Sequence, residues 1–273
     1  MALKKRGLAG RIIGIGRSPE RLQKAMELGA IDEWSTDMAV QDADLVYIAT
    51  PVGLEIDFIR QVVPLAKSGC IITDAGSTKA QICRAADSLI KKDVSFIGGH
   101  PMAGSEATGV TAGNADLFEG AAYVLTPTER TDPEALEAMK GLAEGIGSKV
   151  IVMDPDAHDR CAAVISHLPH LIAASLVSLA HDRSMQDPQV FELIAGSFRD
   201  MTRVAGSSPA LWRDICLSNP DAIKDAVTNF QELLGEGLSA MESRSPEAVE
   251  KWFAEGKRVR DSLSPRRKPD LRE

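Results

Sequence analysis

The stretch that decides the fold runs from Asp44 to Asp74 and reads D-L-V-Y-I-A-T-P-V-G-L-E-I-D-F-I-R-Q-V-V-P-L-A-K-S-G-C-I-I-T-D. It opens with a β-rich run that Pro51 ends, and it closes with a second apolar run from Cys70 to Asp74. The segment between them, near Leu54–Lys67, has the apolar spacing of an amphipathic helix. Two apolar strands joined through a helix predict parallel strands with a right-handed crossover.

The same alternation continues on both sides of this unit. Further strands are expected at Arg11–Gly16, Val94–Gly98, Ala121–Leu125 and Lys149–Met153. Further helices are expected over Lys79–Lys91, from Pro133, and after the first of these strands, where Ser18-Pro19-Glu20 form the cap and first turn. The pattern predicts an α/β fold with a Rossmann-like, doubly wound parallel sheet.

Strand signals stop after Asp154, where a long helical stretch from His158 to Ala180 begins. We therefore expect a dinucleotide-binding domain over residues 1–154 and an all-helical domain over 155–263. Residues 264–273 are charged and contain proline, so we expect a disordered tail.

Composition excludes several classes of protein. The formal charge of −8 gives neither a nucleic-acid nor a membrane-surface footprint, although a local arginine cluster could still bind a small anion. The four cysteines have no metal-like spacing, which favours reduced, buried thiols in a cytoplasmic protein. We find no apolar run that approaches the length of a membrane span.

One expected feature is missing from the first domain. A dinucleotide-binding sheet opens with a strand and a G-x-G-x-x-G turn that leads into the first helix. Here the sequence begins with A-L-K-K-R-G, which reads as that helix, while Gly14 and Gly16 lie within or at the end of a strand. A true start upstream of Met1 explains this more simply than evolved loss of the motif.

The first of four motifs that carry chemistry is G-G-H-P-M-A-G-S-E, residues 98–106, directly after a strand. Ligands of open α/β sheets bind beyond the carboxyl ends of the strands, so His100 projects toward the expected crevice. An imidazole that titrates near neutrality can accept a hydroxyl proton. A loop histidine satisfied by backbone groups is the plainer interpretation.

The second motif, D-A-G-S-T-K at residues 74–79, ends the preceding strand. Ser77 could hydrogen-bond a substrate hydroxyl or orient His100. Its plainer role is the N-cap of the next helix, a position that serine strongly prefers, and both roles could hold at once.

The third motif is S-H-L-P-H at residues 166–170, which we expect to open a helix. His167 and His170 are three residues apart and share a face. A zinc site would need a third ligand, and none lies at a recognisable spacing. A polar wall of the substrate pocket is the favoured interpretation, and we expect no metal.

The fourth motif, F-R-D-M-T-R at residues 198–203, is followed by L-W-R-D at 211–214. Asp200 and Arg203 are three apart on a helix, where an exposed ion pair is the plain interpretation. The sharper hypothesis is that the planar guanidinium of Arg203 binds a substrate carboxylate.

Together and in this order, the four motifs resemble the prephenate/arogenate dehydrogenase family over nearly the whole chain. By that resemblance, His100 is the catalytic base for the ring hydroxyl and Ser77 is its hydrogen-bonding companion. His170 lines the pocket with His167, and Arg203 binds a carboxylate near Asp200, Trp212 and Arg213. The resemblance also implies a helical dimerisation domain, hence a homodimer, and a small-molecule substrate.

The implied reaction is an NAD(P)⁺-dependent oxidative decarboxylation that serves tyrosine biosynthesis. Prephenate would give 4-hydroxyphenylpyruvate, and arogenate would give tyrosine. The two substrates differ only by a keto or an amino group, so the sequence does not choose between them. It is equally silent on feedback inhibition by tyrosine.

The candidate cofactor contacts are Arg17, Ser18, Thr50, Pro51 and Ser77. NAD-specific domains carry an acid at the end of the second strand, whereas a nearby arginine accommodates a 2′-phosphate. Here Gly16 takes the position of the acid and is followed by Arg17 and Ser18, a sequence that favours NADP⁺. If Arg17 only stacks on the adenine, NAD⁺ remains acceptable.

Two alternatives stay open at this point. The chain could be another dehydrogenase, such as a β-hydroxyacid dehydrogenase or pyrroline-carboxylate reductase, but neither explains the first and fourth motifs together. It could also be a non-catalytic relic of the same fold.

Overall fold

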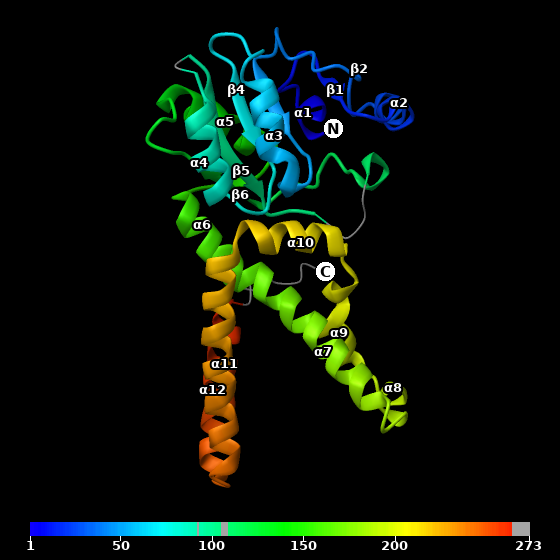
Figure 1. The fold of residues 1–273 in the computed structure, drawn as a ribbon, viewed down its shortest axis with the longest axis vertical. Coiled ribbons are helices and arrows are strands. Elements are labelled where there is room, and N and C mark those ends of the chain that lie inside the picture. The colour runs from blue at the N-terminus through cyan, green and yellow to red at the C-terminus, as the bar shows by residue number, and fades with distance from the viewer. Residues whose placement is uncertain (92, 105–108, 264–273) are drawn as a thin grey trace, which may run out of the picture. The chain divides into compact units, whose positions relative to one another are not determined.

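The computed structural model describes residues 1–91, 93–104 and 109–263 (Figure 1). The proposed tail, 264–273, and Ser105 and Glu106 of the first motif lie outside the described residues. By its internal contacts the chain divides into two compact units, Met1–Ile223 and a second from Lys224 onward.

The first part of the chain alternates strands and helices, which confirms the predicted α/β fold. Its strands are β1 (Ile13–Ile15), β2 (Glu33–Ser35), β3 (Leu45–Ile48), β4 (Ile71–Asp74), β5 (Ser95–Pro101), β6 (Ala122–Thr126) and β7 (Lys149–Val152). Its helices are α1 (Ala2–Lys5), α2 (Pro19–Glu27), α3 (Val52–Val62), α4 (Ala80–Leu89), the short η1 (Val110–Ala112) and α5 (Pro133–Gly145). The sequence patterns did not predict β2, whose three residues, E-W-S, are too few for an alternating pattern.

The strands form two sheets, β1-β2 and β3-β4-β5-β6-β7. All pairs are parallel except β5 with β6, which is antiparallel, so the sheet is mostly rather than wholly parallel. Between β5 and β6 the described chain has only η1 and no crossover helix, and a return without a crossover places the next strand antiparallel. Among the described residues, β1 and β3 each have a neighbouring strand on one edge only.

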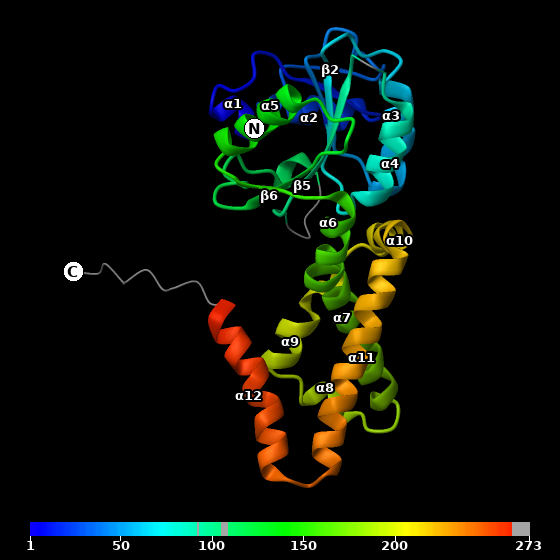
Figure 2. The ribbon, with the colours of Figure 1, turned by 90° about the vertical axis from the view of Figure 1, so that its left-hand side faces the viewer.

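Helices cover both faces of the five-stranded sheet, as Figure 2 shows for α3 and α4 on one side and α1 and α5 on the other. The α3–α4 side packs around Ile59, Ile72 and Phe96. The α5 side packs around Ile97, Leu125 and Met139. Burial on both faces is what apolar parallel strands require.

The chain after β7 is helical, as expected. Its elements are α6 (Pro155–Ala162), the π-helical turn η2 (Ala163–His167), α7 (Leu168–Ser184), α8 (Gln189–Glu192), α9 (Gly196–Thr202), η3 (Arg203–Gly206), α10 (Pro209–Ser218), α11 (Pro220–Glu242) and α12 (Pro246–Leu263). The domain boundary at Asp154 stays a prediction.

The expectation that S-H-L-P-H opens a helix is wrong. Helix α6, the π turn and α7 run without interruption from Pro155 to Ser184, so His167 and His170 lie in the middle of a long helix. Proline lacks an N–H and clashes with the carbonyl four residues earlier. The wider π turn just before Pro169 relieves that conflict and lets the helix continue.

By length and composition alone, the helix Pro155–Ser184 is long and apolar enough to cross a membrane, and 28% of its most apolar 18-residue stretch is buried within the chain. The expectation that no segment approaches that length therefore does not hold for this helix. The core helix of a soluble protein meets the same criterion, so one such helix is weak evidence.

Candidate active site

His100 lies within β5 rather than in a loop after it, and it is paired in register with Val124 of β6. The two preceding glycines are required by close packing. A Cβ on Gly98 would lie 2.3 Å from Thr126 Oγ1, and one on Gly99 would lie 2.5 Å from the backbone oxygen of Asp74. The G-G-H sequence thus lets the end of β5 lie tight against its neighbours and holds His100 on a rigid strand.

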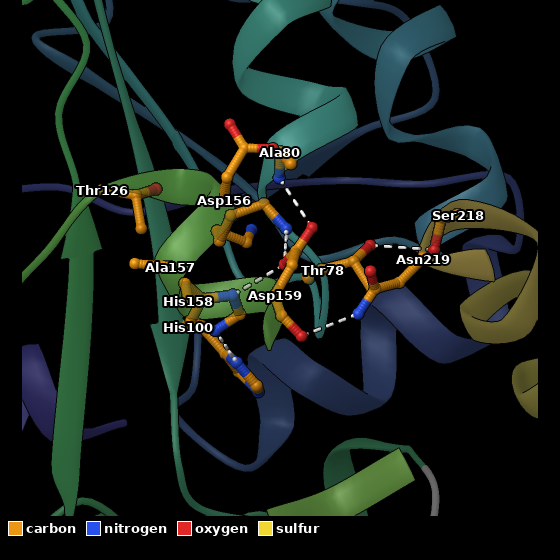
Figure 3. Close-up of polar contacts among 12 residues, drawn as sticks. Thr78, Ala80, His100, Thr126, Asp156, Ala157, His158, Asp159, Ser218 and Asn219 are labelled. Carbon is orange, nitrogen blue, oxygen red and sulfur yellow. Dashed lines mark hydrogen bonds and ion pairs between the residues drawn. The ribbon is translucent and has the colours of Figure 1, made fainter. Parts of the chain in front are cut away.

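The ring of His100 is hydrogen-bonded to a second histidine that the sequence analysis missed. His100 Nδ1 lies 2.8 Å from His158 Nε2, and His158 Nδ1 lies 2.8 Å from Asp159 Oδ1 (Figure 3). His158 and Asp159 come from α6 and are each 3% exposed. The only local signal was the pair H-D one turn after the capping Asp154, and nothing in it reveals a partner 58 residues away.

Asp159 also caps helix α4. Its Oδ1 accepts from Lys79 N at 2.7 Å, and its Oδ2 accepts from Ala80 N at 2.9 Å. The interpretation of Ser77 as the N-cap is therefore wrong: the N-cap position is Lys79, and the acceptor comes from α6. Two N–H groups at the start of a helix would otherwise be buried without partners, at a cost of about 1–3 kcal/mol each.

The pKa of His100 is lowered to about 3, first by burial and then by repulsion from His158, Lys79 and His167. Lowering a histidine pKa favours the neutral ring. His100 therefore has an unprotonated nitrogen throughout the physiological range, which a base requires.

A buried charge cluster lies beneath the site. Lys79 and Asp74, both fully buried, form an ion pair, and Asp74 also accepts from Gly76 N at 2.8 Å and Gly99 N at 3.0 Å. Glu55 of α3 is 1% exposed, and its pKa is raised to about 9 by burial and by the nearby Asp74 carboxylate. Within the described chain neither oxygen of Glu55 has a hydrogen-bond partner.

His167 and His170 share a face, as predicted, and both contact Trp212 of α10. The His170 ring stacks on the indole with 3.8 Å between the ring centroids, and the His167 ring lies edge-on to it with a centroid distance of 6.1 Å. Asn219 Nδ2 donates to the backbone oxygen of Asp159 at 2.9 Å and lies 3.4 Å from His167 Nδ1. This asparagine links His167 to the main chain at Asp159.

The other residues predicted to bind substrate or assist His100 are partly buried or exposed. Ser77 is partly buried beside Thr78, whose hydroxyl bonds to Ser218 at 2.9 Å, and no hydrogen bond joins Ser77 to His100 among the described residues. Asp200 and Arg203 are exposed at the α9–η3 junction. Arg213 is ion-paired with Asp214 at 2.6 Å.

The residues proposed to bind the cofactor follow β1 and β3. Arg17 is exposed after β1, and Ser18 caps α2, as predicted, by accepting from Arg21 N at 3.3 Å. Thr50 and Pro51 follow β3, and the buried Thr50 hydroxyl has no partner in the described chain. Orphaned polar atoms at the carboxyl ends of parallel strands fit a bound dinucleotide.

Among the described residues, no group of three or more His, Cys, Asp or Glu side chains is arranged so that it could hold a metal ion.

A Rossmann-like sheet, a neutral histidine at the end of one strand and an orphaned hydroxyl at the end of another indicate a dinucleotide-dependent oxidoreductase. The family description "prephenate dehydrogenase, nucleotide-binding domain" matches residues 1–152, and "prephenate dehydrogenase, dimerization domain" matches residues 154–255. The chain belongs to the prephenate dehydrogenase family.

Similarity to individual proteins supports the same family. The chain is 40% identical to prephenate dehydrogenase of Bacillus subtilis, over 98% of this chain and 73% of that protein. Among solved structures, prephenate dehydrogenase from Aquifex aeolicus in complex with hydroxyphenyl propionate and NAD⁺ has a TM-score of 0.91 at 33% identity, covering 96% of this chain and 92% of that one. Synechocystis arogenate dehydrogenase has a TM-score of 0.84 at 30% identity, covering 96% and 94%.

The buried His167 leads to a prediction about stability. Burial lowers its pKa to about 4, so between pH 6.5 and 4 the unfolded chain binds a proton that the folded chain refuses. The free energy of unfolding should therefore decrease as pH falls through this interval, by at most about 3 kcal/mol from this group. Urea unfolding of His167→Gln should show a correspondingly flatter pH dependence than wild type, and equal slopes would contradict the assignment.

Proposed function

We propose that this protein oxidatively decarboxylates prephenate or arogenate with NAD(P)⁺, the committed oxidation of tyrosine biosynthesis. The observation that carries the proposal is the neutral, strand-held His100, which lies in a chain of this family and is hydrogen-bonded through Nδ1. That bond directs the other ring nitrogen, Nε2, away from His158 and leaves it available to a substrate.

In this reaction the substrate is a cyclohexadienol with a carboxylate at the opposite ring carbon. His100 Nε2 accepts the hydroxyl proton as the C–O bond becomes a carbonyl. Bound NAD(P)⁺ would accept the hydride from the same carbon. The ring carboxylate then leaves as CO₂, its bonding electrons make the ring aromatic, and the proton held by His100 can return to the phenolate oxygen.

The remaining site residues are proposed in the roles that the family resemblance gives them. Ser77 is the exception: the resemblance makes it the hydrogen-bonding companion of His100, but no bond joins the two among the described residues. We therefore assign the Ser77 hydroxyl the other role considered, a hydrogen bond to the substrate hydroxyl. His170 and His167, held by Trp212, form a polar wall of the pocket. Arg203 binds a substrate carboxylate, with Asp200 and Arg213 nearby in the sequence.

The cofactor would be held by Thr50 and Pro51 at the end of β3, by Ser77 after β4, and by Arg17 and Ser18 after β1. We propose a preference for NADP⁺ because Gly16 supplies no acid and Arg17 is exposed. The Ser18 hydroxyl already bonds to Glu20 at 2.8 Å, so the 2′-phosphate contact would depend on Arg17.

We further propose a homodimer formed through the helices, in a cytoplasmic enzyme. The matched dimerization domain is supported by large apolar side chains exposed on α7, on and just after α8, and on α11 and α12, among them Leu179, Phe191, Leu193, Leu233, Leu238 and Phe253. A second copy of the chain would cover such surfaces. This explains why the apolar helix Pro155–Ser184 is so little buried within one chain. We also propose that the chain divides into a dinucleotide-binding domain at residues 1–154 and a helical domain at 155–263.

The direct test is to assay NAD(P)H formation by the purified chain on prephenate and on arogenate, with each cofactor. Turnover on either substrate supports the proposal. A folded chain that turns over neither substrate but binds them would instead indicate a non-catalytic relative.

His100→Asn should lower kcat by ~10²–10⁴-fold, the range for loss of a general base. The asparagine amide can still donate to His158 Nε2, so the fold and cofactor affinity should be retained. The exposed His181→Asn is the control and should match wild type. Near wild-type kcat in the His100 variant would rule out the role.

Arg203→Ala should mainly raise KM, by ~10-fold or more, because a charge-assisted contact to a carboxylate is made in both ground and transition states. Steady-state kinetics on both substrates measure this. If KM is unchanged for prephenate and for arogenate, Arg203 does not bind their carboxylates.

Arg17→Ala should lower kcat/KM for NADP⁺ by about tenfold and leave that for NAD⁺ nearly unchanged, because only NADP⁺ has the 2′-phosphate. Lys24→Ala, which removes an exposed lysine paired with Glu27 on α2, is the control. If the 273-residue chain binds neither cofactor, the comparison is made on a chain extended by a strand and a G-x-G-x-x-G turn ahead of Met1. A tenfold preference for NAD⁺ that the substitution does not alter would refute the NADP⁺ proposal.

A further inference from the structure

The contacts around His158 assign it a role that the four sequence motifs do not contain. We propose that His158 and Asp159 are positioning residues that hold His100 in the tautomer with its proton on Nδ1 and a lone pair on Nε2. The inference rests on the proposed function of His100 as the base.

The direction of each hydrogen bond in the series Asp159–His158–His100 follows from the Asp159 carboxylate. Asp159 Oδ1 accepts from Lys79 N, and Oδ2 accepts from Ala80 N, so both oxygens act as acceptors at the N-terminus of α4. Opposite an acceptor, His158 Nδ1 must carry the hydrogen. The helix N-terminus reinforces this, since it favours negative charge on the carboxylate that caps it.

The second bond follows from the first. We take the His158 ring to carry a single hydrogen, and with that hydrogen on Nδ1 its Nε2 has only a lone pair. His158 Nε2 therefore accepts, and His100 Nδ1, 2.8 Å away, must donate. His100, itself neutral because of its lowered pKa, then has its lone pair on Nε2. One carboxylate thus determines the proton positions in two rings.

The surroundings of His158 support this protonation pattern. His158 is 3% exposed, so water does not compete for its nitrogens. Lys79, which is fully buried, and His167 each oppose a positive charge on His100. Asn219 fixes the main chain at Asp159 by donating to its carbonyl. A wrong tautomer at a catalytic histidine leaves geometry intact but can cost as much activity as losing the base.

Two substitutions at His158 separate this role from a structural one. In His158→Asn the amide lies near the former Nδ1 and can still donate to Asp159, but it does not reach His100. In His158→Gln the carbonyl oxygen can lie near the former Nε2 and accept from His100 Nδ1, while the contact to Asp159 is lost. Each variant therefore keeps one of the two hydrogen bonds.

The expected orders of activity and stability are opposite. His158→Asn should lower kcat by ~10²-fold, the lower end of the range for losing a general base, with KM nearly unchanged. His158→Gln should stay within about fivefold of wild type, although its Tm should be the lower of the two because it breaks the bond to Asp159. A purely structural residue would give kcat values that follow Tm.

The proposal is overturned if His158→Asn retains wild-type kcat, if both variants lose kcat equally, or if kcat follows Tm. His181→Asn and His181→Gln, at an exposed position of α7, control for the chemistry of the replacements. A wild-type chain that is inactive on both substrates would count against the proposed function instead, and the two failures are therefore distinguishable.

Discussion

Asp159 accepts two backbone N–H groups from the first turn of α4 and one ring N–H from His158, while its own carbonyl accepts from Asn219. One residue of α6 therefore holds three other parts of the structure. These are the start of α4, the His158–His100 pair, and the junction of α10 and α11 at Asn219. Loss of this carboxylate would leave buried donors unpaired at about 1–3 kcal/mol each, and it would also free the two rings to change tautomers.

The same residues couple the sheet to the helices within the first unit. The strand β5 presents His100, and its position is fixed by close packing around Gly98 and Gly99. The helix α6 brings the partner imidazole, and the π turn that follows lets the long helix continue through Pro169 so that His167 and His170 reach Trp212. The helical region therefore supplies both the support for the base and one aromatic wall of the proposed pocket.

Much of this could be predicted from sequence because it is local. The strand–helix alternation, the cap at Ser18 and the shared face of His167 and His170 all follow from spacing of a few residues. The errors have non-local causes. An N-cap role was one alternative for Ser77, but an aspartate about 80 residues away caps α4. His158 and Asp159 were overlooked because their partners lie on other elements. The antiparallel direction of β6 was missed because a single strand's pattern does not tell which way the strand runs.

The tautomer of His100 can be measured without substrate or cofactor. In ¹⁵N-histidine-labelled protein, with five histidines in the chain and the His100 signals identified through His100→Asn, nitrogen shifts and ring proton couplings report which nitrogen carries the hydrogen. The account predicts hydrogen on Nδ1 and a lone pair on Nε2, unchanged between pH 8 and about 5 because the ring stays neutral. Hydrogen on Nε2, or an imidazolium in this range, would contradict it.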